Sequence, residues 1–151
     1  MRGETQKVEV FNVPEKLNER FGKDISVLEI SEKRFVAVVA PENMVKVCRY
    51  VFRDLGARMS TATGIDQRSS VELIYHFSLD THNMIVSIKT FAPKPDCTID
   101  SFGAEVPAAV YIEREISEML GVTFRNHPDP RHLELPDDWP VGKFPWKRGE
   151  L

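Results

Sequence analysis

The sequence predicts a single α+β domain of ferredoxin-like type, with an antiparallel sheet and helices packed on it, followed by an extended proline-rich tail. Apolar residues alternate with a period of two between residues 57 and 88, which is typical of strands. They recur at three- and four-residue spacing over residues 44–55, which is typical of a helix. Five of the ten prolines lie in the last 24 residues, where they exclude a regular helix. We therefore assign residues 1–124 to the domain and residues 125–151 to the tail.

The expected order along the domain is helix, strand, strand, helix, strand, strand, strand, helix. These elements are a helix at 14–21, strands at 25–30 and 34–39, a helix at 41–55, strands at 59–63, 71–79 and 84–88, and a helix at 107–120. A further short strand is expected at residues 7–11, before the first helix. Residues 96–103 are expected to form a loop.

Prolines and glycines mark the ends of the expected helices. A proline opens each helix, where its missing N–H is not needed, and a glycine follows each helix as a cap. Both arms of the first hairpin are rich in β-branched residues. The later strands are joined by short polar segments at 64–69 and 80–83, which favours antiparallel neighbours. Pro93 and Pro95 should end the sheet.

Composition limits the classes of function. The chain has 151 residues, is 42% hydrophobic and carries a formal net charge of −3, which fits one core and lacks the basic surface that nucleic acid requires. No apolar run is long enough to span a bilayer, and residues 1–11 do not resemble a signal peptide, so we expect a soluble, cytoplasmic chain. Cys48 and Cys97 are too few to hold an iron–sulfur cluster, and we expect both to be reduced.

Charged residues near the C-terminus do not form a recognisable catalytic pattern. Glu113, Arg114 and Glu115 point about 100° apart on a helix and cannot act together, so a solvated, salt-bridged helix face is the simpler interpretation. Arg114 could pair with Glu118 four residues later. No nucleophile with its base, phosphate loop or dinucleotide motif is present, and we predict no catalytic, cofactor-binding or metal-binding residue.

A metal site at His127, His132 and Glu134 can be written down but is poorly supported. The two histidines are five residues apart across two prolines, whereas helical zinc motifs place them four apart on one rigid face. His127 precedes a proline and is therefore held extended, which suits a hydrogen-bonding anchor at a turn.

The tail carries large apolar side chains that it cannot bury by folding on itself. Trp139, Phe144 and Trp146 stand between prolines, and two tryptophans alone bury too little surface to order such a segment. We therefore expect the tail to lie in a groove of another protein. That groove would also pair with charged tail residues, namely Arg131, Asp137, Asp138, Lys147 and Arg148.

The last third of the chain resembles a known family. Its pattern comprises residues 99–102, Glu-Arg-Glu at 113–115, residues 118–124, His-Pro at 127–128, Arg131 and Pro-Asp-Asp-Trp at 136–139. This pattern is similar to the thirty-kilodalton subunit of respiratory complex I, the NADH:quinone oxidoreductase. Ser117, Glu118, Leu120 and Glu134 depart from the usual family residues. With the short chain, these departures look more like the homologous subunit of membrane-bound nickel–iron hydrogenases and related ferredoxin-linked complexes.

The resemblance implies a structural subunit without a cofactor of its own, in the peripheral arm on the cytoplasmic side of the membrane. It would dock on the large catalytic-type subunit and the small iron–sulfur subunit, and partner subunits would hold the iron–sulfur clusters and any nickel–iron centre. Contact with the membrane would be only indirect. The expected partner-binding residues are Glu113, Arg114, Glu115, His127, Arg131, Asp137, Asp138, Trp139, Phe144 and Trp146.

Two alternatives belong to other classes of protein. The first is a free-standing metal-dependent enzyme that uses His127, His132 and Glu134. The second is a regulatory, ligand-binding ferredoxin-like module, which would form a homo-oligomer without other chains.

Overall fold

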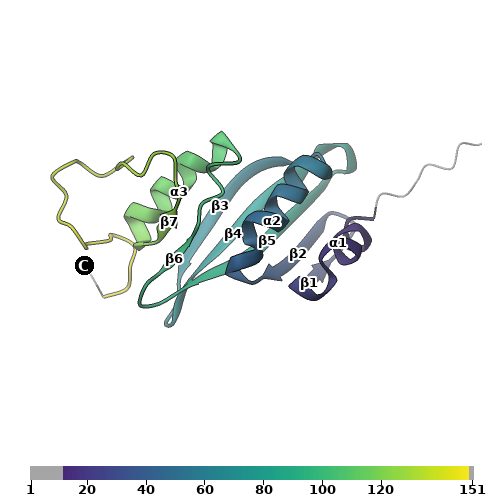
Figure 1. Cartoon of the computed structure of the whole chain (residues 1–151), viewed down its shortest axis with the longest axis horizontal. Coiled ribbons are helices and arrows are strands. Elements are labelled where there is room, and N and C mark those ends of the chain that lie inside the picture. Colours follow the sequence, from purple (N-terminus) through teal and green to yellow (C-terminus); the bar gives the residue numbers. More distant parts are fainter. Residues whose placement is uncertain (1–11, 150–151) are drawn as a thin grey trace, which may run out of the picture.

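Helices cover one face of a five-stranded sheet in the computed structural model, which describes residues 12–149 (Figure 1). The strands are β1 (Ile25–Ile30), β2 (Arg34–Val39), β3 (Arg58–Asp66), β4 (Ser70–Leu79) and β5 (Met84–Pro93). The α-helices are α1 (Val13–Phe21), α2 (Met44–Arg49) and α3 (Pro107–Leu120). Short helical turns are η1 (Gly22–Asp24), η2 (Pro41–Asn43), η3 (Tyr50–Asp54) and η4 (Asp80–His82). The predicted strand at 7–11 lies outside the described residues.

The α+β class and the order of the eight predicted elements are confirmed, but the sheet is mixed. Its strand order is β1-β2-β5-β4-β3, and β2 pairs with β5 in parallel while the other neighbours are antiparallel. The chain leaves β2 through α2, enters the sheet again at the far edge as β3, and returns through β4 to place β5 beside β2. Two reversals from β3 leave β5 in the direction of β2, and local periodicity carries no information about that neighbour.

The helix predicted at 41–55 is one helical segment with three hydrogen-bonding geometries. It begins as the 3₁₀ turn η2, continues as α2 and ends as the π-helical turn η3. Gly56 follows with φ +71°, as expected of a left-handed cap. Cys48 is fully buried on the sheet-facing side of this segment, where burial raises the pKa of its thiol. Both Cys48 and Cys97 are free and buried.

The core lies between the sheet and the helices. Alternate residues of β4, from Val71 to Leu79, are buried on the helix-covered face. Tyr75 and Phe77 each pack edge-on against Phe102, with ring centroids 5.9 and 6.0 Å apart. The helix α3 approaches β3 closely, because a Cβ added at Gly64 would lie 2.6 Å from Leu120 Cδ1. The apolar period therefore places α3 firmly on the sheet.

His76 lies on the sheet face opposite Tyr75 and Phe77, as predicted. Its ring nitrogens lie 2.8 Å from the Ser87 hydroxyl and 3.2 Å from the Thr63 hydroxyl, which links three neighbouring strands. Partial burial lowers the pKa of His76, so the imidazole is neutral in this ladder at neutral pH. We assign His76 a structural role.

A small second sheet joins two segments on either side of α3. It pairs β6 (Thr98–Asp100) in parallel with β7 (Thr123–Arg125). The prediction of a loop over residues 96–103 was therefore wrong at 98–100. Strands of three residues are too short to show a period, so no signal in the sequence identified them. Because β7 spans residue 125, the predicted boundary between domain and tail stays a prediction.

Residues 126–149 contain no regular helix or strand and run back along α3 (Figure 1). The prolines account for this irregular course. Within residues 12–149, no helix is long and apolar enough to cross a membrane.

Candidate functional site

The second half of α3 organises the surface on which the tail lies. The helix starts at Pro107 and ends at Gly121, whose φ of +77° is the left-handed conformation favoured at this cap position. Charged residues at positions 113, 114 and 118 have different roles because each successive residue turns by about 100°. Glu113 faces the sheet, whereas Arg114 and Glu118 contact the tail.

Glu113 is fully buried beneath the helix and accepts four hydrogen bonds from its own chain. Its Oε1 accepts from the Tyr75 hydroxyl at 2.8 Å and from the Phe102 N–H at 2.7 Å. Its Oε2 accepts from the Ser101 hydroxyl and from the Gly103 N–H at 3.2 Å. Burial raises the pKa of Glu113, and these four donors oppose the shift. Burial also raises the pKa of Tyr75 well above its usual value.

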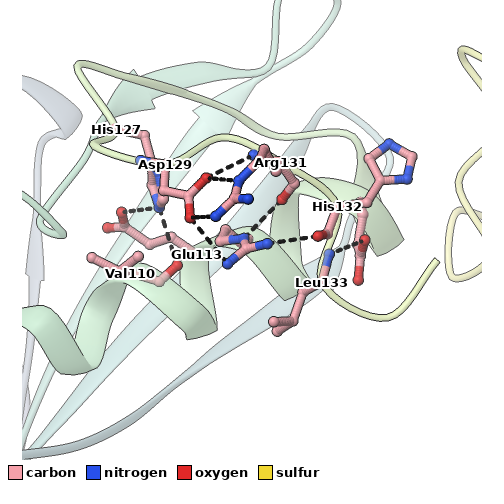
Figure 2. Close-up of polar contacts among 9 residues, drawn as sticks. Val110, Glu113, His127, Asp129, Arg131, His132 and Leu133 are labelled. Atoms are coloured by element: carbon pink, nitrogen blue, oxygen red, sulfur yellow. Dashed lines mark hydrogen bonds and ion pairs between the residues drawn. The ribbon is translucent and has the colours of Figure 1, made fainter. Parts of the chain in front are cut away.

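His127 connects the start of the tail to α3, as the predicted anchor at a turn should (Figure 2). The Asp129 N–H donates to His127 Nδ1 at 3.0 Å, so the proton of the neutral ring lies on Nε2. That Nε2 is 3.1 Å from the Val110 carbonyl oxygen and 3.7 Å from Glu113 Oε2. Both ring nitrogens are therefore engaged within the chain.

Arg114 binds the backbone of the tail. Its guanidinium donates from Nε to the Arg131 carbonyl at 2.7 Å and from Nη2 to the His132 carbonyl at 2.6 Å (Figure 2). Nη1 lies 3.4 Å from Asp129 Oδ2, and only 9% of the Arg114 side chain is exposed. Asp129 also accepts two bonds from the Arg131 guanidinium, at 2.7 and 2.8 Å. The bonds from Arg131 hold the pKa of Asp129 well below its usual range.

Glu118 binds the next three residues of the tail. Its carboxylate accepts the N–H groups of Leu133 at 2.9 Å, Glu134 at 2.7 Å and Leu135 at 3.4 Å. Glu118 is only 6% exposed. The predicted pairing of Arg114 with Glu118 is absent among the ion pairs of residues 12–149, because each side chain binds the tail instead. Together they satisfy two carbonyls and three N–H groups.

The far end of the tail returns to the end of α3. The Trp146 N–H donates to the Met119 carbonyl at 2.9 Å, which satisfies one of the last carbonyls of the helix. Phe144 covers the backbone of Gly121, where an added Cβ would lie 2.7 Å from the Phe144 ring. Beyond these contacts, the Arg148 N–H donates to Asp66 Oδ2 at 2.9 Å. Asp66 Oδ1 is itself 2.6 Å from Lys94 Nζ.

The expectation that the tail needs a foreign groove to become ordered is therefore corrected. The tail lies on its own α3 and is held there by backbone hydrogen bonds to Arg114 and Glu118. The reasoning from sequence counted the apolar area of the tryptophans and a partner's contribution. It did not count two helix residues that satisfy the tail backbone within the same chain, which contribute about 0.5 to 1.5 kcal/mol per bond.

The predicted partner-binding residues fall into two groups. Glu113, Arg114 and His127 are engaged inside the chain and form the foundation of the site. The others reach the surface to different extents: Asp137, Asp138, Arg131 and Trp146 are exposed, and Glu115, Trp139 and Phe144 are partly exposed. Trp139 is held by its indole N–H, which donates to the Lys143 carbonyl at 2.8 Å.

Sequence reasoning missed Tyr75, Asp66 and Val141. Val141 is fully exposed at the outer part of the tail, although nothing but its apolar character in a polar segment marks it. Tyr75 reads as a core residue in the sequence, and only its buried hydroxyl indicates that a polar partner is needed. Asp66 gives no sign in the sequence of its contact with the tail.

The arrangement offers surfaces for protein contact. Among residues 12–149, no cluster of three or more histidine, cysteine, aspartate or glutamate side chains could hold a metal ion. His132 is exposed and contributes its backbone carbonyl to Arg114. What this end of the molecule presents is a pre-ordered loop with exposed apolar and acidic side chains.

Residues 37–149 match the family model described as the 30 Kd subunit of the respiratory-chain NADH dehydrogenase. The chain belongs to this family. The match covers most of the sheet, α3 and the tail. The expected resemblance to the thirty-kilodalton subunit of complex I is therefore confirmed.

Relatives in this family come from bacteria and archaea. The C-lettered subunit of the NADH-quinone oxidoreductase of Geobacter sulfurreducens is 31% identical over 131 residues, which cover 82% of this chain and 80% of that relative. The C-lettered subunit of the F(420)H(2) dehydrogenase of Methanosarcina mazei is 32% identical over 137 residues, with 85% of this chain and 87% of that relative covered.

Two solved structures share the fold. A chain from an archaeal respiratory membrane complex, the membrane-bound sulfane sulfur reductase, superposes with a TM-score of 0.69 and 18% identity, over 85% of this chain and 75% of that chain. A trypsin-resistant fragment of Nqo5 superposes with a TM-score of 0.60 and 16% identity, over 77% of this chain and 97% of that fragment.

Proposed function

We propose that this chain is a structural subunit in the peripheral arm of a membrane-bound, ion-translocating oxidoreductase complex. The observation that carries the proposal is the family match over residues 37–149, together with relatives that are named as subunits of two dehydrogenases. The complex is of complex I type or of membrane-bound hydrogenase type. The chain acts by docking, and its location is peripheral, on the cytoplasmic side of the membrane.

The geometry of the site supports a docking role. Glu113, His127 and Arg114 are the side chains best suited to acid–base chemistry or anion binding, and each is occupied by hydrogen bonds within the chain. Their bonds fix the course of the tail rather than point into an open cleft. The side chains left accessible, above all Val141 and Trp146, are apolar groups of the kind that interfaces bury.

The partners we propose are the large catalytic-type subunit and the small iron–sulfur subunit of the same complex. Partner subunits hold the iron–sulfur clusters, and any nickel–iron centre, through which electrons pass. This chain binds no cofactor, and it contributes ordered surface to the assembly. The pre-ordering of the tail on α3 lowers the entropy that association must overcome.

Affinity purification of the tagged full-length chain from mild-detergent extracts of its own cells tests this proposal. We expect the large and the iron–sulfur subunits to be recovered with it. The double substitution Val141→Asp and Trp146→Ala should reduce their recovery severalfold, because both side chains are exposed on the tail. Leu28→Asp is a matched control, since Leu28 is 58% exposed on β1, at the opposite end of the molecule from the tail (Figure 1).

Two results would refute the proposal. The first is recovery of the wild-type chain without any oxidoreductase subunit. The second is a free chain that carries stoichiometric metal and turns over a substrate alone, as the alternative of a metal-dependent enzyme requires.

A further inference from the structure

The outer part of the tail and the end of α3 enclose a notch of about 250 Å³. Its walls include Glu118, Asp137, Trp139, Val141 and Phe144. The notch is open to solvent, and it is too small for a folded segment. Its size suits one long side chain of another protein.

The charges around the notch are predominantly negative. Glu118 and Asp137 line it, and Glu134 and Asp138 are exposed beside Asp137 in the chain. Lys143, also part of the lining, is the lysine that opposes these four carboxylates. A charge balance of this kind favours a cationic occupant.

Glu118 gives an independent reason to expect a cation. Its carboxylate is 6% exposed, and only backbone N–H groups are hydrogen-bonded to it. Within residues 12–149, no ion pair with Glu118 occurs. A buried carboxylate without a counterion, at the wall of an open notch, gains from an approaching positive charge that displaces little water.

Trp139 makes arginine a better occupant than lysine. The indole is fixed by its bond to the Lys143 carbonyl, so its position in the wall is already set. A guanidinium can stack on an aromatic ring and at the same time donate in a fork to a carboxylate such as Asp137. An ammonium group lacks that planar geometry.

We propose that this notch receives an arginine side chain of a partner subunit. This inference rests on the proposed docking function and specifies the chemistry of the partner's surface. That surface carries an arginine beside an apolar depression, into which the exposed Val141 fits. The guanidinium lies between Trp139 and the carboxylates of Asp137 and Glu118.

The test uses the full chain labelled with ¹⁵N and the probe N-acetyl-arginine methylamide. We expect a saturable shift of the Trp139 indole N–H signal. The matched probe N-acetyl-citrulline methylamide has the same shape without the charge, and it should give a response at least twofold to fivefold weaker, as should the lysine analogue. Equal responses to the arginine and citrulline probes, or no saturable shift, would overturn the proposal.

Two variants locate the response. Asp137→Asn removes a lining charge and should weaken binding of the arginine probe by about twofold to fivefold, whereas Asp138→Asn, beside the notch, should change it less. Both residues are exposed, so both variants should fold. Equal effects of the two substitutions would overturn the placement in the notch.

Failure of this inference can be distinguished from failure of the proposed function. A chain that co-purifies with oxidoreductase subunits but does not discriminate between the probes refutes the notch alone. A chain that discriminates but co-purifies with no such subunit refutes the complex.

Discussion

The sheet and the tail of this protein are held together by different forces. The sheet and its helices bury a continuous set of apolar side chains, and polar contacts such as Glu113 with Tyr75 are few and deeply buried. The tail buries little apolar surface and is held by hydrogen bonds from Arg114, Glu118 and Asp66 to its backbone. The comparison teaches that a segment without a core can still be ordered when the neighbouring helix satisfies its polar groups.

Removing the buried carboxylate below α3 should have the largest effect on the body. Glu113→Ala leaves one hydroxyl of Tyr75 and two loop N–H groups, at Phe102 and Gly103, without their acceptor. We expect the free energy of unfolding to fall by about 3 to 5 kcal/mol in denaturant titrations. Glu115→Ala, two residues along the same helix and partly exposed, should change it by less than about 0.5 kcal/mol. A loss below about 1 kcal/mol for Glu113→Ala would contradict the assigned role.

Two glycines with positive φ separate backbone strain from tail packing. Gly121 and Gly142 have φ of +77° and +79°, but only Gly121 lies under Phe144. Gly142→Ala should cost about 1 kcal/mol of stability through strain alone. Gly121→Ala should cost about 1 to 3 kcal/mol more, because an added Cβ would overlap the Phe144 ring. Equal losses in thermal unfolding would mean that Phe144 does not rest on the helix.

Glu118→Ala should release the tail and leave the sheet intact. The variant removes the acceptor of three tail N–H groups, from Leu133 to Leu135, and the expected cost to tail attachment is about 1.5 to 3 kcal/mol. Limited proteolysis should then cut the tail at least tenfold faster than in the wild type. Glu134→Ala is the control, because that side chain is exposed. Unchanged cleavage in Glu118→Ala would show that the tail is held by other contacts.

Acid should affect the two regions in opposite directions, with the smallest effect. The pKa of Asp129 is lowered from 3.8, so its contribution is present above pH 3.8 and is lost as the pH falls through the folded value. The pKa of Glu113 is raised from 4.5, so its contribution is present below pH 4.5 and is lost as the pH rises through the folded value.

An NMR titration of the tail amides checks the acid response. We expect the amides around Asp129 to shift below pH 3.8 in the wild type and not in Asp129→Asn. For the body, Glu113→Gln should remove the fall in stability above pH 4.5. Tail amides that titrate identically in Asp129→Asn would exclude Asp129 as the group responsible.

Periodicity predicted the body of the molecule well. The spacing of Val71 to Leu79 and of Met44 to Leu55 identified a strand and a helix, because burying one face of an element imposes its period on the sequence. The parallel pair β2–β5 could not be predicted in this way, since any neighbour that buries the same face satisfies the same pattern. The three-residue strands β6 and β7 were too short to show a period.

The candidate site was only partly visible in the sequence. The residues that form its foundation were singled out, including Glu113, Arg114 and His127, but as surface groups that meet a partner. Their bonds are made to backbone carbonyls and N–H groups, which every residue carries, so no pattern of side chains reveals such partners. Glu118 was noted as a departure from the family residue and a possible partner of Arg114, and not as a ligand of the tail backbone.

Hydrogen exchange of the isolated full-length chain tests the central claim, that α3 orders the tail without another protein. The decisive amides are those of Leu133, Glu134 and Trp146, which donate to Glu118 and to the Met119 carbonyl. We predict exchange at least tenfold slower than in an unstructured peptide of the same sequence, with the amide of Asp138 as the unprotected reference. Exchange of all three amides at the rate of the free peptide would contradict the account.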